Sequence, residues 1–166
     1  LTVPIINYDV KNAVDWVEYC NGDERTEYGL LRERRGIKEP YGVECLFVGN
    51  EVYYFDKELA ADGNFAGEKE KAFINAIKAV DSSIKTVVGF CPNMPKWSAT
   101  SLKVCENAAD IISHHYYFTN EFEDNFGKIT KKDVPDVEKS FRESLDKTKE
   151  LALKTSKKSW NISVDE

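Results

Sequence analysis

Residues 43–51 read VECLFVGNE, and this stretch indicates how the rest of the chain folds. Val43 to Val48 is largely apolar, with Gly42 before it and Gly49 after it. A short apolar run bounded by turn residues is typical of a strand that is covered on both faces of a parallel sheet. Glu51 then stands just past the C-terminal end of this strand, at the edge where parallel-strand folds place their functional groups.

Apolar runs alternate with amphipathic segments along the whole chain, which favours a parallel sheet with helical crossovers. Five strands are predicted, at residues 1–7, 43–48, 84–90, 110–117 and 160–164. Four helices are predicted between them, at residues 12–19, 67–80, 99–107 and 137–154. Asp9 and Asp133 are the expected N-caps of the first and the last helix. Residues 53–64 and 119–132 are the two long connections.

Five parallel strands with right-handed crossovers fit two α/β architectures. One is an open doubly wound sheet, and the other is a (β/α)8 TIM barrel of which only some strands are present. The first and last predicted elements are strands, so no terminal helix covers an edge of the sheet, and natural proteins avoid uncovered edge strands. We therefore expect residues 1–166 to form one partial catalytic domain, a fragment of a (β/α)8 barrel.

The composition excludes several classes of function. Hydrophobic residues make up 42% of the 166 residues, and 23 Lys and Arg against 29 Asp and Glu give a formal net charge of −6. Without a long basic run, no nucleic-acid partner is expected. No stretch approaches the roughly 20 apolar residues of a membrane span, and residues 1–6 lack the pattern of a signal peptide.

Cysteine usage favours neither a metal site nor a disulfide framework. Cys20, Cys45, Cys91 and Cys105 are far apart, with no Cys-x-x-Cys pair and no histidine at zinc-finger spacing. Buried free thiols are the simplest interpretation, and they slightly favour a reducing, cytoplasmic compartment over secretion. We expect no metal ion and no organic cofactor.

Two acidic residues far apart in the sequence each follow an apolar strand. Glu51 follows the strand that ends at Val48, and Glu166 follows, with Asp165, the strand that ends at Val164. Cleavage of a glycosidic bond needs such a pair, because one carboxyl group must protonate the departing oxygen while the other attacks the anomeric carbon or directs water to it. Taken singly, either residue also fits a solvated turn or chain terminus.

A third predicted strand ends in the segment SHHYYF at residues 113–118. Successive residues of a strand face opposite sides, so His115 and Tyr117 share one side and His114 and Tyr116 share the other. One side is expected to face the carboxylates and to line a sugar pocket. Packed aromatic rings with satisfied polar tips are the alternative interpretation.

The three tryptophans are candidates for stacking on a sugar. Trp97 follows Pro92 and Pro95 in a predicted loop, and it is the candidate that we keep for the pocket. Trp16 and Trp160 fall within predicted helix and strand patterns, so they are expected to pack in the core.

Several motifs occur together and in one order: WVEYCNG at 16–22, EPY at 39–41, GNE at 49–51, ISHHYY at 112–117 and VDE at 164–166. In this combination the chain resembles the retaining α-L-arabinofuranosidases of glycoside hydrolase family fifty-one. WVEYCNG followed by EPY and GNE is specific, whereas GNE or DE alone would be weak. The resemblance covers essentially the whole chain.

The resemblance implies roles for individual residues. Glu51 would be the general acid/base at the end of the fourth barrel strand, and Glu166 the nucleophile at the end of the seventh. Asn50 would contact the sugar hydroxyl next to the anomeric carbon. His115 and Tyr117 match a His-x-Tyr of the family, in which the Tyr hydrogen-bonds the nucleophile. The five strands would be the third to the seventh, with the other barrel strands and a C-terminal β-sandwich absent from this chain.

The chain departs from the family pattern around its GNE motif. Leu46 stands where a Trp is common, and Val52, Tyr53 and Tyr54 replace the usual Gly-containing continuation. The acceptor side of the pocket is therefore expected to differ.

The resemblance implies a glycosidase that releases terminal α-L-arabinofuranosyl residues from polysaccharides or oligosaccharides, as in arabinan degradation, with retention of configuration. For this, the pKa of Glu51 must lie above that of Glu166. An endo-acting β-glucanase or xylanase of the same barrel type is one alternative, and a non-catalytic carbohydrate-binding or assembly relative is another. A homo-oligomer is expected by analogy alone.

Overall fold

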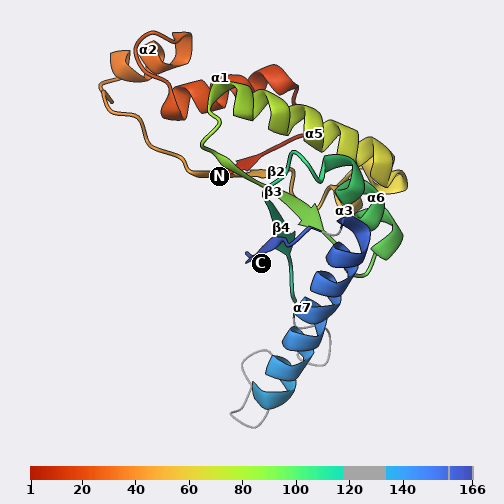
Figure 1. The fold of residues 1–166 in the computed structure, drawn as a ribbon. Coiled ribbons are helices and arrows are strands. Elements are labelled where there is room, and N and C mark those ends of the chain that lie inside the picture. Colours follow the sequence, from red (N-terminus) through yellow and green to blue (C-terminus); the bar gives the residue numbers. More distant parts are fainter. Residues whose placement is uncertain (118–133, 157, 166) are drawn as a thin grey trace.

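The computed structural model describes residues 1–117, 134–156 and 158–165. Its centre is a parallel sheet of five strands in the order β1-β2-β3-β4-β5 (Figure 1). The strands are β1 (Thr2–Val3), β2 (Cys45–Val48), β3 (Lys85–Phe90), β4 (Ile111–His114) and β5 (Asn161–Val164). All five predicted strands are therefore present, and each is shorter than its predicted range.

Four long helices match the four predicted ones: α1 (Val10–Asn21), α5 (Gly63–Val80), α6 (Pro95–Cys105) and α7 (Val134–Ser156). Asp9 caps α1 as expected. Its Oδ1 accepts the Asn12 N–H at 3.0 Å, and the Asn12 side chain accepts the Asp9 N–H at 3.1 Å. The other expected cap, Asp133, lies outside the described residues.

Three short helices were not predicted: α2 (Glu27–Arg34), α3 (Val52–Phe55) and α4 (Lys57–Ala61). None of them carries an apolar stripe long enough to be recognised in the sequence. The buried residues of α2 are Gly29 and Arg32, neither of which is an apolar side chain. The helices α3 and α4 occupy most of what was predicted as the long connection at residues 53–64.

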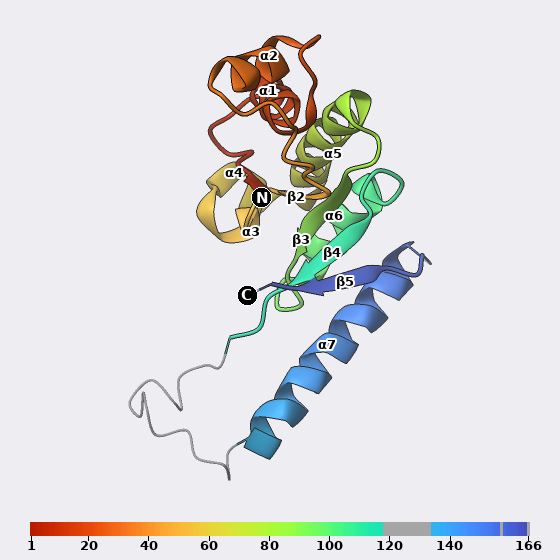
Figure 2. The ribbon, with the colours of Figure 1, turned by 90° about the vertical axis from the view of Figure 1, so that its left-hand side faces the viewer.

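The strand order distinguishes the two expected architectures. Neighbouring strands of the sheet are consecutive in the sequence, and consecutive long helices pack against one another. A doubly wound sheet would instead reverse its order at a switch point and carry helices on both faces. Figures 1 and 2 show α1, α5, α6 and α7 following one another along one side of the sheet. The fold is therefore part of a (β/α)8 barrel, as predicted.

The two faces of the sheet differ in burial. The outer face of β1 to β4 packs under the helices, and its apolar residues are at most 5% exposed: Val3, Leu46, Val48, Val88, Phe90 and Ile112. On the inner face, Thr2 and Cys45 are exposed and Phe47 is half-buried, whereas Val87 and Ser113 of the middle strands are buried. The prediction that β2 is covered on both faces is therefore wrong for the described residues, because their sheet does not close into a ring.

The amide of Asn21 joins three elements at the N-terminal end of the sheet. Its Nδ2 donates to the Val43 carbonyl oxygen at 2.9 Å and to Asp81 Oδ2 at 2.8 Å, and its Oδ1 accepts the Val43 N–H at 2.7 Å. Hydrogen bonds from Ser83 and Asn21 lower the pKa of Asp81. The end of α1, the start of β2 and the end of α5 are thereby fixed to one another.

Arg32 of α2 is only 1% exposed, and its guanidinium satisfies backbone groups of the same region. It donates at 2.6–3.3 Å to four carbonyl oxygens, those of Tyr19, Gly22, Ile37 and Lys38. These bonds offset the cost of burying a charge that cannot be removed by deprotonation. A Cβ at Gly22 would lie 2.5 Å from the Glu18 carbonyl oxygen, so the close approach requires glycine.

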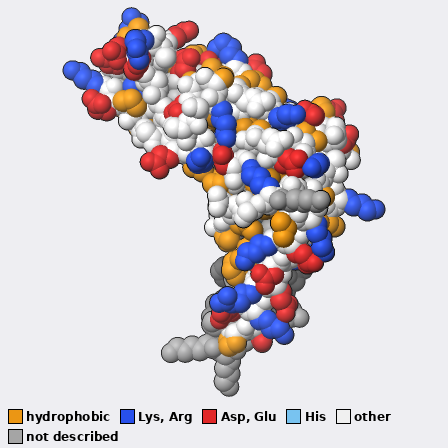
Figure 3. All heavy atoms as spheres, in the orientation of Figure 1, with side chains coloured by type: hydrophobic (Ala, Val, Ile, Leu, Met, Phe, Trp, Pro, Cys, Tyr) orange, Lys and Arg blue, Asp and Glu red, His pale blue; other side chains and the backbone are white. Residues whose placement is uncertain are grey.

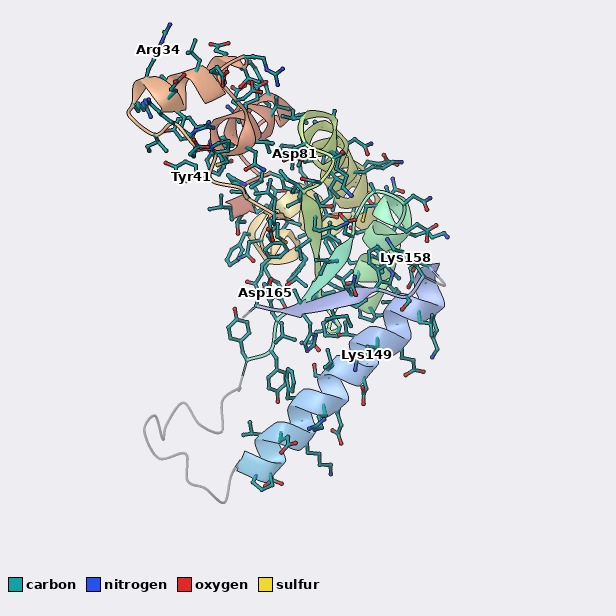
Figure 4. The ribbon with its side chains drawn as sticks, turned by 60° about the vertical axis from the view of Figure 1, so that its left-hand side comes forward. Arg34, Tyr41, Asp81, Lys149, Lys158 and Asp165 are labelled. Atoms are coloured by element: carbon teal, nitrogen blue, oxygen red, sulfur yellow. The ribbon has the colours of Figure 1, made fainter. Side chains whose placement is uncertain are left out.

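WVEYCNG, at residues 16–22, is therefore a structural motif in this fold. Its Asn and Gly, with the backbone of its Tyr, build the turn after α1 on which Arg32 and the start of β2 depend. Figure 4 shows Arg34 and Tyr41 of this region well away from Asp165. The motif thus acts at the end of the sheet opposite to the strand ends that carry Glu51.

The surface agrees with the composition. On the face drawn in Figure 3, acidic and basic side chains are interspersed over the helices and form no large patch of one sign. In the part of the chain that the structure describes, no helix is long and apolar enough to span a membrane.

A buried carboxyl group lies between α5 and α6. Glu70 is fully buried, and its Oε2 accepts the hydroxyl of Ser101 at 2.7 Å. Its Oε1 is also buried and has no hydrogen-bond partner among the described residues. Burial raises the pKa of Glu70 to about 8, so the group is protonated at neutral pH.

We expect Glu70 to make the protein less stable as pH rises from about 4.5 to about 8. In this window the folded state keeps the proton and the unfolded state does not, so the free energy of unfolding falls by about 1.4 kcal/mol per pH unit on account of this group. Glu70→Gln keeps an acceptor for Ser101 but cannot ionise, and it should remove this slope. Thermal unfolding between about pH 5 and pH 9 measures the difference.

Glu68→Gln is the matched control, because Glu68 lies on the same helix with its side chain 58% exposed. This variant should keep the slope of the unmodified protein. An unchanged pH dependence in Glu70→Gln would show that Glu70 does not hold its proton in the fold.

Candidate active site

Glu51 is placed by a turn with unusual backbone geometry. Gly49, just after β2, has φ 75°, and Glu51 has φ 45° and ψ 37°. A Cβ at Gly49 would lie 2.9 Å from side-chain atoms of Ile5 and Val52, so the turn requires glycine there. Among the described residues, Glu51 is the only one other than glycine with positive φ. Such a conformation costs about 1–3 kcal/mol and is characteristic of functional sites.

The carboxylate of Glu51 is directed to β4 and not to its own helix. Glu51 occupies the N-cap position of α3, yet its side chain makes no capping hydrogen bond. Its Oε1 lies instead 3.0 Å from Nδ1 of His115, and the two side chains are 13% and 7% exposed. A carboxylate from one strand end and an imidazole from another therefore meet in a largely buried contact.

His115 also approaches a second carboxylate. Its Nε2 lies 3.5 Å from Oδ1 of Asp165, and the same oxygen accepts the Ser113 hydroxyl at 2.5 Å. The Phe47 ring on the inner face of β2 meets the His115 ring edge-on, with 6.1 Å between the centroids. Glu51, His115 and Asp165 thus connect the C-terminal ends of β2, β4 and β5.

The inner face of the sheet forms a hollow of about 480 Å³ beside these residues. Phe47, Asn50, Val87, Ser163 and Asp165 are among the residues that line it. The Oδ1 atom of Asn50 is buried and has no hydrogen-bond partner within the described ranges. A buried acceptor in a hollow of mixed polarity suits a ligand that carries hydroxyl groups.

His114 and Tyr116 lie on the other side of β4, as the alternation predicts. Nδ1 of the buried His114 is 3.0 Å from Oγ1 of Thr148 in α7, and Tyr116 packs edge-on against Phe141 of the same helix. Burial lowers the pKa of His114. The interpretation as packed aromatics therefore holds for this half of the segment, whereas His115 faces the carboxylates.

The other predicted site residues have different outcomes. Tyr117, beyond the end of β4, is 56% exposed. Glu166 and the connection at residues 119–132 lie outside the described residues. Asp165, which precedes Glu166, lies at the C-terminal end of β5 (Figure 4).

Trp97 is not a pocket residue, and that prediction is wrong. It lies in α6 with 7% exposure, and its Nε1 donates to the Leu59 carbonyl oxygen at 2.7 Å. Pro95 begins the helix at N1, where proline is tolerated, although we interpreted it as a loop residue. Trp16, expected in the core, is instead 46% exposed, while Trp160 does pack against the core as expected.

The prediction of buried free thiols holds for two of the four cysteines. All four are free; Cys91 and Cys105 are buried, Cys20 is half-buried and Cys45 is exposed on the inner face of β2. Across residues 1–117, 134–156 and 158–165, no group of three or more His, Cys, Asp or Glu is arranged to hold a metal ion.

Ser113 and Asp165 were not predicted as site residues, although the sequence carries a signal for both. Side chains two apart on a strand share a face, so Ser113 shares the face of His115. The parallel register places Ser113 opposite Ser163, and Asp165 is again two residues further on. Ser113 and Asp165 were missed because the register between β4 and β5 is not contained in the pattern of either strand.

Comparisons with known proteins agree with this geometry. Residues 4–134 match the family model of the α-L-arabinofuranosidase 1 domain. The chain is 31% identical to the intracellular exo-α-(1→5)-L-arabinofuranosidase of Acetivibrio thermocellus, over 95% of this chain and 32% of that protein.

Solved structures show the same likeness. The α-L-arabinofuranosidase of Thermotoga maritima, in its arabinose complex, matches with a TM-score of 0.81 and 26% identity over 99% of this chain and 33% of that one. The thermostable family fifty-one α-L-arabinofuranosidase of Thermotoga petrophila matches with a TM-score of 0.70 and 25% identity, over 88% of this chain and 29% of that one.

The chain spans about a third of the length of these relatives. Its strand order is that of a barrel, and the family model covers most of its residues. The chain therefore belongs to the α-L-arabinofuranosidases of glycoside hydrolase family fifty-one and forms part of their (β/α)8 barrel.

Proposed function

We propose that the whole protein is a retaining glycosidase that releases terminal α-L-arabinofuranosyl residues from arabinose-containing polysaccharides or oligosaccharides. The observation that carries this proposal is the Glu51 carboxylate, held at a strand end in a strained backbone conformation and 3.0 Å from His115 Nδ1. Family membership supports the arabinofuranosyl specificity, since the relative from Acetivibrio thermocellus is an exo-α-(1→5)-L-arabinofuranosidase.

The proposed reaction is a double displacement by two carboxyl groups. Glu51 protonates the leaving oxygen while Glu166 attacks the anomeric carbon, and a covalent glycosyl-enzyme forms. Glu51 then removes a proton from water, which displaces Glu166 and releases the sugar. Retaining pairs of this kind are separated by about 5 Å. The position of Asp165 beside His115 supports this role for the end of β5.

The neighbouring residues have supporting roles in this proposal. Asn50, whose buried Oδ1 has no partner among the described residues, accepts a hydrogen bond from the hydroxyl next to the anomeric carbon. His115 holds Glu51 in place through the contact of 3.0 Å. Tyr117 hydrogen-bonds the nucleophile, as the family resemblance implies.

We further infer that the described strands are the third to the seventh of the barrel, and that the remaining strands and a C-terminal β-sandwich lie outside this chain. The inference is supported by the open inner face of the sheet and by the third of the relatives' length that the chain covers. Tests of activity therefore require the full-length protein.

The full-length protein should release arabinose from α-(1→5)-linked arabino-oligosaccharides. NMR spectra recorded early in the reaction should show a product with the anomeric configuration of the substrate, because two displacements restore it. Inversion would contradict the proposed roles of Glu51 and Glu166. Turnover of a β-glucan or a xylan in place of arabinosides would identify a different glycosidase, and sugar binding without turnover a non-catalytic relative.

Glu51→Gln should lower kcat/KM for arabino-oligosaccharides by about 10²–10⁴-fold, because the poor leaving group no longer receives a proton. Hydrolysis of an aryl arabinofuranoside with a good leaving group should lose much less, since its departing oxygen does not need the proton. Glu58→Gln, which removes a first-turn carboxylate of the nearby helix α4, is the control and should change neither value. Equal losses of Glu51→Gln on both substrates would argue against the acid/base assignment.

A further inference from the structure

Two large aromatic side chains lie exposed directly after Glu51. Tyr54 is 57% exposed and Phe55 is 70% exposed, and both belong to α3, the helix that Glu51 begins. They fall in the segment where the chain departs from the usual continuation of the GNE motif. Tyrosine is enriched at interfaces, where its ring contacts a partner and its hydroxyl makes a hydrogen bond.

Tyr54 is held in place more firmly than an ordinary exposed side chain. Its hydroxyl lies 3.6 Å from Sγ of Cys91, just after β3. Its ring meets Tyr53 edge-on at 4.7 Å between centroids, and Tyr53 meets the buried Trp97 in the same way at 5.4 Å. A series of rings therefore runs from the core to the exposed Tyr54. A ring fixed in this way loses little conformational entropy when a ligand binds to it.

Tyr54 is also close to the proposed acid. Its backbone N–H donates to the Glu51 carbonyl oxygen at 2.8 Å, so the two residues lie within one helical turn. The hydrogen bond with Cys91 and burial raise the pKa of Tyr54 to about 12, and the charge of Glu51 adds to the effect.

The position over β3 is a second constraint. β3 is the middle strand of the five, and Cys91 follows it directly. The Tyr54 hydroxyl therefore lies at the C-terminal end of β3, the edge of the sheet where Glu51 and His115 also meet.

The position of the catalytic acid determines which part of a substrate lies beside Tyr54. The acid must reach the oxygen that joins the bound sugar to its leaving group, so side chains beside the acid flank the leaving group. We propose that Tyr54 is the stacking surface for the first sugar ring of the leaving group, and that it makes the enzyme prefer oligosaccharides over arabinosides with small leaving groups. This inference rests on the proposed function, and it names a specificity-determining residue of the same site.

Two substrates can distinguish an effect of Tyr54 on binding of the leaving group from an effect on the chemical step. An α-(1→5)-linked arabinotriose carries a sugar ring in its leaving group, whereas α-L-arabinofuranosyl fluoride carries none. In the full-length protein, Tyr54→Ala should lower kcat/KM for the triose about 10-fold, mainly through a higher KM, as expected for the loss of one aromatic contact. Its kcat/KM for the fluoride should stay within about 2-fold of the unmodified enzyme, since no contact is lost.

Matched variants test the reason for the loss. Tyr54→Phe keeps the ring and should retain most of the activity on the triose. Tyr41→Ala removes a tyrosine of similar exposure, 53%, at the opposite end of the sheet, and should leave both substrates unaffected. Tyr54→Leu keeps apolar bulk without an aromatic face; should Tyr54→Ala fail to fold, it must show the same selective loss on the triose.

Each other outcome is informative. Equal loss on both substrates would mean that Tyr54 only supports the Glu51 turn, and no loss on either would mean that it does not contact the leaving group; both overturn the inference. An unmodified full-length protein that hydrolyses neither substrate would contradict the proposed function itself, before any variant is compared.

Discussion

All strands of the sheet run in one direction, and each pair of neighbouring strands must therefore be joined by a crossover along the outer face. The consequence is that every strand reaches the same edge with its C-terminal end. Glu51 and His115 are 64 residues apart in the sequence, and Ser113 and Asp165 are 52 residues apart, yet all four meet at this edge. The side chains of the site are therefore close together because parallel strands end at the same edge of the sheet.

Much of the fold could be predicted because its signals are local. The apolar run before Gly49 and the helical spacing around Phe73 and Ile77 are both evident in the sequence, and both elements are present. The helix α2 could not be found in this way, since the buried Arg32 replaces an apolar stripe and its partners are backbone carbonyls elsewhere. Trp97 was misplaced for a related reason: Pro95 permits a helix start as readily as it signals a loop.

The candidate site was only partly accessible from the sequence. The alternation along β4 correctly separates His114 from His115, because it depends on a period of two that any strand imposes. Asp165 depends on the register between β4 and β5, which the pattern of one strand does not contain. The motifs behind the family resemblance have two kinds of role in the fold. WVEYCNG builds the turn after α1, while GNE and the segment after Ile112 supply the strand-end side chains.

The left-handed backbone at Glu51 has a consequence for how this position evolves. A glycine would adopt the same dihedral angles without steric penalty, so folding alone favours replacing the glutamate. The proposed reaction requires a carboxyl group at this point, and under that proposal selection on catalysis opposes selection on stability at a single residue. Loss of catalytic demand on a copy of this gene would allow the position to drift first toward residues that relax the turn.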